Sequence, residues 1–126
     1  MKKKSKKKIL IIEDEKILAE MYHDTFINAG FEVISAVEAS EGLVIAKKEK
    51  PDLIILDILL PGENGIVFLK KLREESAISS ISIVVFTNYD DSATQRKARD
   101  LGVKDYLIKA NFTPKQFVEK IKRYLK

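Results

Sequence analysis

The chain has 126 residues, which fits one compact domain. Apolar residues make up 45% of it and charged residues 33%, a balance that excludes collagen and low-complexity disorder. It has no Cys and only one His, so disulfides, Cys-ligated zinc and His-rich metal sites are excluded. Its apolar runs are far shorter than the roughly 20 residues of a membrane-spanning helix, so we expect no membrane span.

The net charge of +4 comes from one segment. Six lysines lie within residues 2–8, and without them the chain has 17 basic and 19 acidic residues, a net charge of −2. We therefore expect residues 1–8 to form a basic, disordered tail and residues 9–126 to form the domain. Weak contact of this tail with phosphates is the only nucleic-acid binding we expect. Acids directly after the first apolar run exclude a signal peptide, and we expect a cytoplasmic protein.

In chain order, the pattern first predicts a strand at 9–12, a helix at 17–29, a strand at 31–36, a helix at 40–48 capped by Ser40, and a buried strand at 53–56. After a turn-rich loop at 61–65 it predicts a helix at 66–72, a strand at 81–86, a weakly amphipathic helix at 92–101 and a strand at 106–108. The last helix is well signalled, since Thr113 is its cap, Pro114 its first residue and Gln116 the partner in a capping box.

Each connection between predicted strands is long enough to hold a helix. This favours parallel pairing and a three-layer α/β domain. The sequence contains no internal repeat and no linker, so we expect no separate output domain within it.

Polar residues stand at the carboxyl ends of four predicted strands, where ligands bind in open parallel sheets. They are Glu13 and Asp14 after the first strand, Asp57 after the third, Thr87 after the fourth and Lys109 after the fifth. Any one of them could simply begin a loop or cap a turn. All of them together, in this order, indicate a site.

Asp57 is the most informative of these residues, because a charge flanked by apolar residues on both sides is costly. Three carboxylates converge in a half-buried pocket only with a proton or a cation, and a set of oxygen ligands suits Mg²⁺. Together with Lys109 and Thr87, such a cluster is suited to phosphoryl transfer, in which a carboxylate attacks in line.

These residues resemble the receiver domain of two-component response regulators, closest in size to stand-alone, chemotaxis-type receivers. The resemblance rests on residues 9–15, 51–65, 87 and 102–109, and it covers residues 8–125. It implies a flavodoxin-like fold, in which a five-stranded parallel sheet of order 2-1-3-4-5 is flanked by five helices.

The resemblance also implies a phosphorylation site. Asp57 would accept a phosphoryl group from a histidine kinase or a histidine phosphotransfer protein. Asp14 would bind Mg²⁺ directly and Glu13 through water, while Asp57 and the backbone carbonyl of Leu59 would complete the ligands. Apart from its own phosphorylation and dephosphorylation, the protein would catalyse nothing.

Further residues match the positions that contact or respond to the phosphoryl group in the family. Lys109 would contact its oxygens, Thr87 would move to hydrogen-bond one of them, and Tyr106 would turn inward as an aromatic switch. The output surface would be the face made by the fourth helix, fifth strand and fifth helix, which would control a downstream protein. The chain would be a monomer, or a dimer formed on phosphorylation.

The sequence departs from the family pattern in several places. Ala110 follows Lys109, where the family commonly has a proline in a cis peptide, so the sequence leaves the isomer of this peptide open. Asn88 stands where a small residue is usual, and Glu13 replaces the commoner Asp. Leu59 and Tyr89 occupy two positions that tune dephosphorylation in the family, and we expect them to hinder the attacking water.

Other functions are conceivable. A degenerate receiver could act as a phosphorylation-independent interaction module, but such proteins usually lack one of the acids, the Thr or the Lys. A metal-dependent phosphatase would need an acid where Leu59 stands. A flavin-binding domain would need a phosphate-binding loop after the first strand, and none is present.

Overall fold

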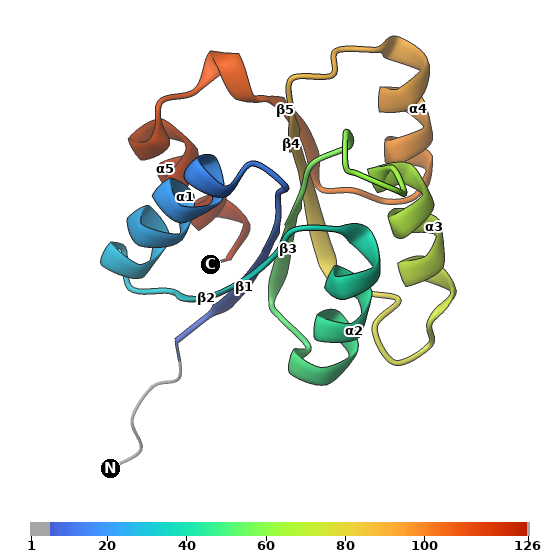
Figure 1. Ribbon diagram of the computed structural model, residues 1–126, viewed down its shortest axis with the longest axis horizontal. Helices are drawn as coiled ribbons and strands as arrows, with labels where there is room; N and C mark the ends of the chain where they lie inside the picture. Colours follow the sequence, from blue (N-terminus) through green and yellow to red (C-terminus); the bar gives the residue numbers. More distant parts are fainter. Residues whose placement is uncertain (1–5, 126) are drawn as a thin grey trace.

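Figure 1 shows the computed structural model, which describes residues 6–125. In chain order the elements are β1 (Lys8–Ile12), α1 (Lys16–Asn28), β2 (Glu32–Ala36), α2 (Ala39–Glu49), β3 (Leu53–Leu56), α3 (Gly65–Glu74), β4 (Ser82–Thr87), α4 (Ser92–Asp100), β5 (Asp105–Ile108), the 3-10 helix η1 (Lys109–Asn111) and α5 (Pro114–Tyr124). No helix in this part of the chain is both long and apolar enough to cross a membrane.

The strands form one parallel sheet in the order β2-β1-β3-β4-β5, with α1 and α5 on one face and α2, α3 and α4 on the other (Figure 1). The predicted fold class and strand order are confirmed. Helices cover both faces because each parallel crossover must return over the sheet, and this is why β3 is buried at every position.

The core lies in two layers, one on each face of the sheet. On the α1/α5 face the rings of Phe86 and Phe117 stack with centroids 3.6 Å apart, and Tyr22 meets both edge-on. The opposite layer is largely aliphatic and includes Phe68. The aromatic side chains of α1, α3 and α5 with helical spacing, Tyr22, Phe26, Phe68 and Phe117, are all buried.

Most helix ends follow the expected chemistry. The capping box of Thr113 and Gln116 is present at α5. The weakly amphipathic α4 forms with Asp91 as its cap, because this carboxylate accepts a hydrogen bond from the backbone N–H of Thr94. The predicted Ser40 cap is wrong: α2 begins one residue earlier, and the Ser40 hydroxyl donates to Glu38 instead.

The boundary between tail and domain lies earlier than the sequence indicated. Lys8 belongs to β1, opposite Glu32 of β2, and its Nζ lies 3.0 Å from Glu49 Oε1 and 3.2 Å from Glu32 Oε2. These two carboxylates hold a residue that the charge pattern had placed in the tail. Most of the predicted basic tail, residues 1–5, lies outside the described residues.

Candidate functional site

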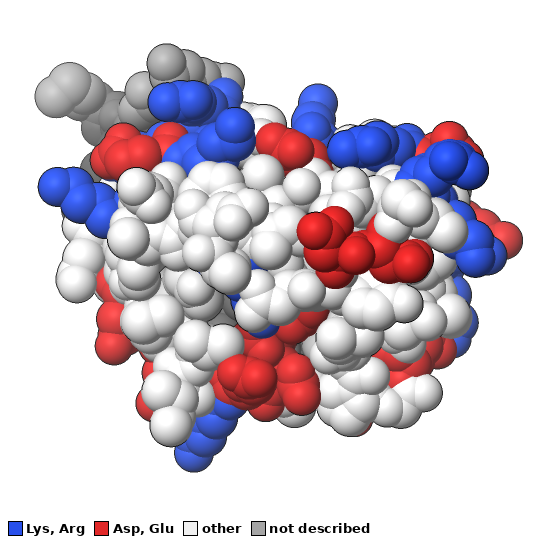
Figure 2. Space-filling model, turned by 90° about the horizontal axis from the view of Figure 1, so that it is seen from above, with Lys and Arg blue, Asp and Glu red and all other residues white. Residues whose placement is uncertain are grey.

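The carboxyl ends of the strands meet at one edge of the sheet. Because β1 pairs with β3 and Ile12 lies opposite Leu56, the residues that follow, Glu13 and Asp57, are neighbours. Figure 2 looks onto this edge: acidic side chains reach the middle of the face beside a hollow, and most Lys and Arg side chains lie around its rim. The fold alone therefore concentrates negative charge here.

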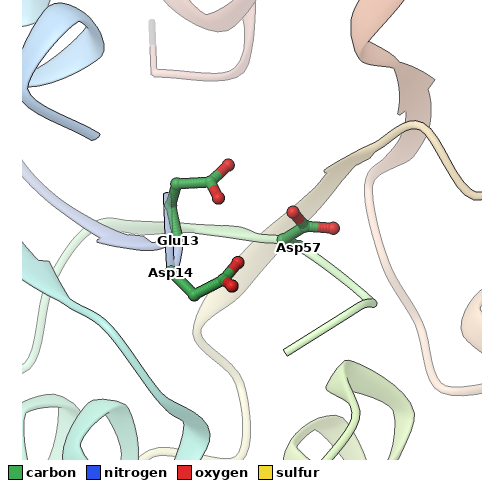
Figure 3. Close-up of side chains that lie close together, drawn as sticks. All are labelled: Glu13, Asp14 and Asp57. Atoms are coloured by element: carbon green, nitrogen blue, oxygen red, sulfur yellow. The ribbon is translucent and has the colours of Figure 1, made fainter. Parts of the chain in front are cut away.

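Three carboxylates form the centre of the site. Glu13 and Asp14 extend from the end of β1 toward Asp57, which follows β3 (Figure 3). One oxygen of each lies within 4.8 Å of the others. Glu13 and Asp57 are only 4% and 7% exposed, whereas Asp14 is open to solvent, so the cluster is buried on one side and accessible on the other.

Lys109 bridges the two buried acids. Its Nζ donates to Asp57 Oδ2 at 2.8 Å and to Glu13 Oε1. Burial raises the pKa of the Glu13 carboxyl, although the hydrogen bond from Lys109 opposes this. Burial also lowers the pKa of Lys109, but its hydrogen bonds to the two acids outweigh that effect and raise it. Lys109 therefore stays protonated between them.

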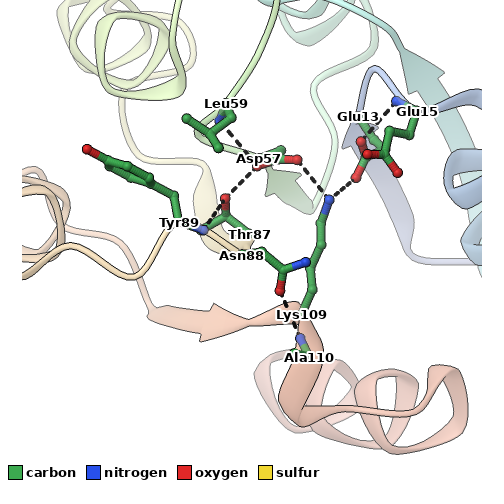
Figure 4. A network of polar contacts seen from close by, with 9 residues as sticks. All are labelled: Glu13, Glu15, Asp57, Leu59, Thr87, Asn88, Tyr89, Lys109 and Ala110. Carbon is green, nitrogen blue, oxygen red and sulfur yellow. Dashed lines mark hydrogen bonds and ion pairs between the residues drawn. The ribbon is translucent and has the colours of Figure 1, made fainter.

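The other oxygen of Asp57 is held from β4 and from the β3–α3 loop (Figure 4). Thr87 Oγ1 donates to Asp57 Oδ1 at 2.6 Å, and the backbone N–H of Leu59 donates to the same oxygen at 3.2 Å. Thr87 is completely buried. Since Lys109 holds Oδ2, the whole carboxylate is fixed in one orientation.

Tyr106 of β5 is connected to this network through Tyr89. Its ring is buried, and its hydroxyl donates to the backbone carbonyl of Tyr89 at 2.6 Å. The backbone N–H of Tyr89 donates in turn to Thr87 Oγ1 at 3.2 Å. Burial, with a contribution from nearby acids, raises the pKa of Tyr106 to about 12. The ring of Tyr106 is thus already buried in this structure, and its role as a switch residue stays a prediction.

Gly65 is a site residue that the sequence identified only as part of a turn-rich loop. Its N–H donates to the Ile58 carbonyl at 2.8 Å, and a Cβ at this position would lie 2.5 Å from the backbone oxygen of Asp57. Only glycine lets α3 begin so close to the strand end. The sequence placed Gly65 at the end of the loop rather than at the start of α3, and it gave no sign of this contact.

The peptide between Lys109 and Ala110 is trans, since residues 6–125 contain no cis peptide. Lys109 nevertheless reaches Asp57, so the missing proline does not displace it. The backbone N–H of Ala110 donates to Asn88 Oδ1 at 3.0 Å, a contact that sequence reasoning did not foresee.

Leu59 and Tyr89 flank Asp57 on the side away from Lys109 (Figure 4). Their side chains are 56% and 39% exposed, and both line a groove of about 320 Å³ between α3 and α4. The metal-ligand role of the Leu59 carbonyl stays a prediction, because the contact found for its backbone is through the N–H.

The residues present fit a divalent metal ion. The donors are carboxylate oxygens, which hard cations such as Mg²⁺ prefer. The three acids and the ammonium of Lys109 carry a formal net charge of −2, which one divalent ion would balance. The exposed side of the cluster, at Asp14, offers an approach from solvent.

Comparisons with known proteins agree with this geometry. The model of the response regulator receiver domain matches residues 9–122. The alkaline phosphatase synthesis transcriptional regulatory protein PhoP of Bacillus subtilis is 33% identical over 95% of the chain, and the phosphate regulon regulatory protein PhoB of Escherichia coli is 32% identical over 95%. The chain spans about half the length of these relatives, 49% and 52%.

Solved structures give the same result. The chemotaxis protein CheY4 of Vibrio cholerae superposes with a TM-score of 0.87 at 27% identity, covering 95% of this chain and 99% of that one. A CheY-like receiver domain protein of Methanospirillum hungatei superposes with a TM-score of 0.89 at 28% identity, covering 96% and 94%.

Proposed function

The chain belongs to the family of response regulator receiver domains, and on this premise we propose that it is a phosphorylation-activated switch of a two-component phosphorelay. The observation that carries the proposal is the buried carboxylate of Asp57, held by Thr87 on one oxygen and Lys109 on the other. A carboxylate fixed in this way, next to two further acids, is oriented for attack on a phosphoryl group.

In this proposal Glu13, Asp14 and Asp57 hold Mg²⁺, with the backbone carbonyl of Leu59 as a further ligand. When bound, the ion neutralises charge on the phosphoryl oxygens. Lys109 neutralises charge from the other side, because its ammonium lies against Asp57 in a buried position. The net negative charge of the acids explains why phosphorylation would require the ion.

The transfer itself is an in-line displacement. An oxygen of Asp57 forms a bond to phosphorus while the bond between phosphorus and the donor histidine nitrogen breaks, and that nitrogen keeps the electron pair. Lys109 and Thr87, which both hydrogen-bond Asp57, would hydrogen-bond the phosphoryl oxygens as the negative charge moves onto the aspartyl phosphate. No proton has to leave Asp57, since its ionised form is the nucleophile.

The output would pass through Thr87 to Tyr106. In the unphosphorylated chain Thr87 Oγ1 donates to Asp57, and on phosphorylation the same hydroxyl would donate to a phosphoryl oxygen. Tyr89 and Tyr106 follow Thr87 in the hydrogen-bond network, so a shift of this hydroxyl reaches the α4, β5 and α5 face. That face would contact the downstream protein.

The proposed partners are a histidine kinase or histidine phosphotransfer protein, and a downstream protein target, all in the cytoplasm. We propose a monomer in the resting state, with dimerisation on phosphorylation as the alternative. A phosphorylation-independent interaction module is disfavoured because every acidic, hydroxyl and ammonium group of the site is in place.

The test is incubation with Mg²⁺ and acetyl phosphate, followed by measurement of the intact mass. We expect a gain of one phosphoryl group in the wild type and none in Asp57→Ala. Asp52→Ala, an exposed acid at the opposite end of β3, is the matched control and should be phosphorylated normally. No gain in the wild type, or an equal gain in Asp57→Ala, would refute the proposal.

A further inference from the structure

Two departures from the family pattern contact each other in this structure. The backbone N–H of Ala110 donates a hydrogen bond to Asn88 Oδ1 (Figure 4). A proline in place of Ala110 would have no N–H to donate, and glycine or alanine in place of Asn88 would have no side-chain oxygen to receive it. The hydrogen bond therefore exists only because both positions differ from the usual residues.

This hydrogen bond lies at the edge of the sheet where β4 and β5 end, next to two residues of the site. Thr87 and Ile108 are the last paired residues of β4 and β5. Asn88 directly follows Thr87, and Ala110 lies two residues beyond Ile108, so the Asn88 side chain links the two segments just beyond the last pairing of β4 and β5. It joins the backbone next to Thr87 to the backbone next to Lys109, the two residues whose side chains hold Asp57.

Lys109 is held through its ammonium and Phe112 through its ring, which packs against Phe86 and Phe117, but few contacts fix the backbone at Ala110 between them. Asn88 and Ala110 are both exposed, so packing does not hold them, and the η1 turn is closed on itself by the hydrogen bond from Phe112 N–H to the Lys109 carbonyl. A lysine side chain has several rotatable bonds, so its ammonium keeps its contact with Asp57 only if the backbone that carries the side chain is fixed.

We propose that Asn88 is a positioning residue: by accepting the Ala110 N–H it holds the backbone after Lys109 and so keeps Lys109 Nζ on Asp57. Asn88 does not touch Asp57 or the acids, so it acts only through Lys109. That Asn88 affects the rate of phosphorylation rests on the proposed function. That Asn88 positions Lys109 does not rest on it, and this effect is measured separately.

Three variants separate this role from a general structural one. Asn88→Ala removes the acceptor oxygen, whereas Asn88→Asp keeps an oxygen at the same distance along the side chain. Asn111→Ala is the matched control, because Asn111 is an exposed asparagine one residue beyond Ala110. Since Asn88 is exposed, we expect all three to fold with thermal midpoints close to the wild type.

The first measurement is competitive acetylation of lysines without any phosphodonor, analysed by peptide mass spectrometry. The Lys109 amine is engaged by two carboxylates, so it should react slowly in the wild type, Asn88→Asp and Asn111→Ala. In Asn88→Ala it should react several-fold faster. Equal Lys109 reactivity in Asn88→Ala and the wild type would overturn the proposal.

The second measurement is the rate of phosphorylation by acetyl phosphate at saturating Mg²⁺. One lost hydrogen bond should slow Asn88→Ala roughly 3- to 10-fold, with recovery in Asn88→Asp. In Asn88→Ala the apparent Mg²⁺ affinity should not change, since this substitution neither adds nor removes an acid. A wild type that is never phosphorylated would refute the proposed function, but the Lys109 reactivities would still decide the role of Asn88.

Discussion

Thr87 Oγ1 donates to Asp57 Oδ1 across 2.6 Å, and the same hydroxyl accepts a hydrogen bond from the backbone N–H of Tyr89 at 3.2 Å. One buried side chain thus connects Asp57 to the β4–α4 loop. The family resemblance implies that Thr87 moves to hydrogen-bond a phosphoryl oxygen. In this structure it needs only to exchange one oxygen acceptor for another.

Thr87→Ala should uncouple the output from phosphorylation. The variant should still be phosphorylated within roughly tenfold of the wild-type rate, because only one of the groups holding Asp57 is lost. The response of Tyr106 should disappear. Amide NMR spectra with and without a phosphoryl mimic test this, with Thr87→Ser, which keeps the hydroxyl, as the control. The same shift at Tyr106 in Thr87→Ala and the wild type would count against coupling through Thr87.

Asp14→Ala should weaken Mg²⁺ binding and phosphorylation together. Even residues that only support a metal ligand typically contribute roughly 10- to 100-fold to affinity, so loss of a direct carboxylate should cost at least as much. Titration with Mg²⁺ followed by tyrosine fluorescence measures the affinity. Asp24→Ala, an exposed acid on α1, is the control. Normal phosphorylation of Asp14→Ala, or of the wild type in excess EDTA, would show that the acids do not act through a metal.

Leu59→Asn and Tyr89→Glu should shorten the lifetime of the aspartyl phosphate. Both side chains border the open side of Asp57, and neither Leu nor a Tyr ring turned away from the site orients water there. A polar group should speed phosphate release by roughly 2- to 10-fold, the equivalent of one hydrogen bond to the attacking water. Release is compared from pre-phosphorylated proteins at equal Mg²⁺. Val67→Asn, in the same groove, is the control. Unchanged phosphate release from both test variants would show that Leu59 and Tyr89 do not limit access of the attacking water.

Tyr106 and Tyr124 should ionise late in an alkaline titration. Burial raises the pKa of each to about 12, helped at Tyr124 by its hydrogen bond to Asp105. Because the folded chain holds these protons more tightly than the unfolded chain, the stability they contribute is complete below pH 10 and is lost as the pH rises toward 12. The ionisation is followed by tyrosinate absorbance. Tyr106→Phe and Tyr124→Phe should each remove one tyrosine that ionises well above pH 10. Titration of all tyrosines near the ordinary pKa in the folded protein would contradict it.

The fold was predictable because its central strands β1, β3 and β4 are almost entirely buried. Apolar runs such as Leu53–Leu56 cannot lie at a surface, and helix-length connections between such runs favour a parallel sheet. The predictions from the sequence were wrong where the local pattern was overridden by contacts with other parts of the fold. Ser40 is a good cap by residue type, but the helix begins at Ala39, and Lys8 joins the sheet because two carboxylates from other elements reach it.

The polar residues of the site were predictable because each stands directly at the end of a strand. Asp57, Thr87 and Lys109 are far apart in sequence, yet parallel strands bring their ends to one edge. The bond between Asn88 and Ala110 was not predictable, because it depends on the register of β4 against β5, and the continuous apolar run of β4 has no polar alternation that would indicate this register.

The network around Tyr89 uses the backbone and the side chain of this residue for different purposes. Its N–H contacts Thr87 and its carbonyl accepts from Tyr106, whereas its ring lies outside this path, in the groove beside Asp57. Substitutions at this position would therefore alter how long the signal persists and leave its transmission intact. The duration of a response and its amplitude could then be adjusted independently, which would let one scaffold serve both fast and slow signalling circuits.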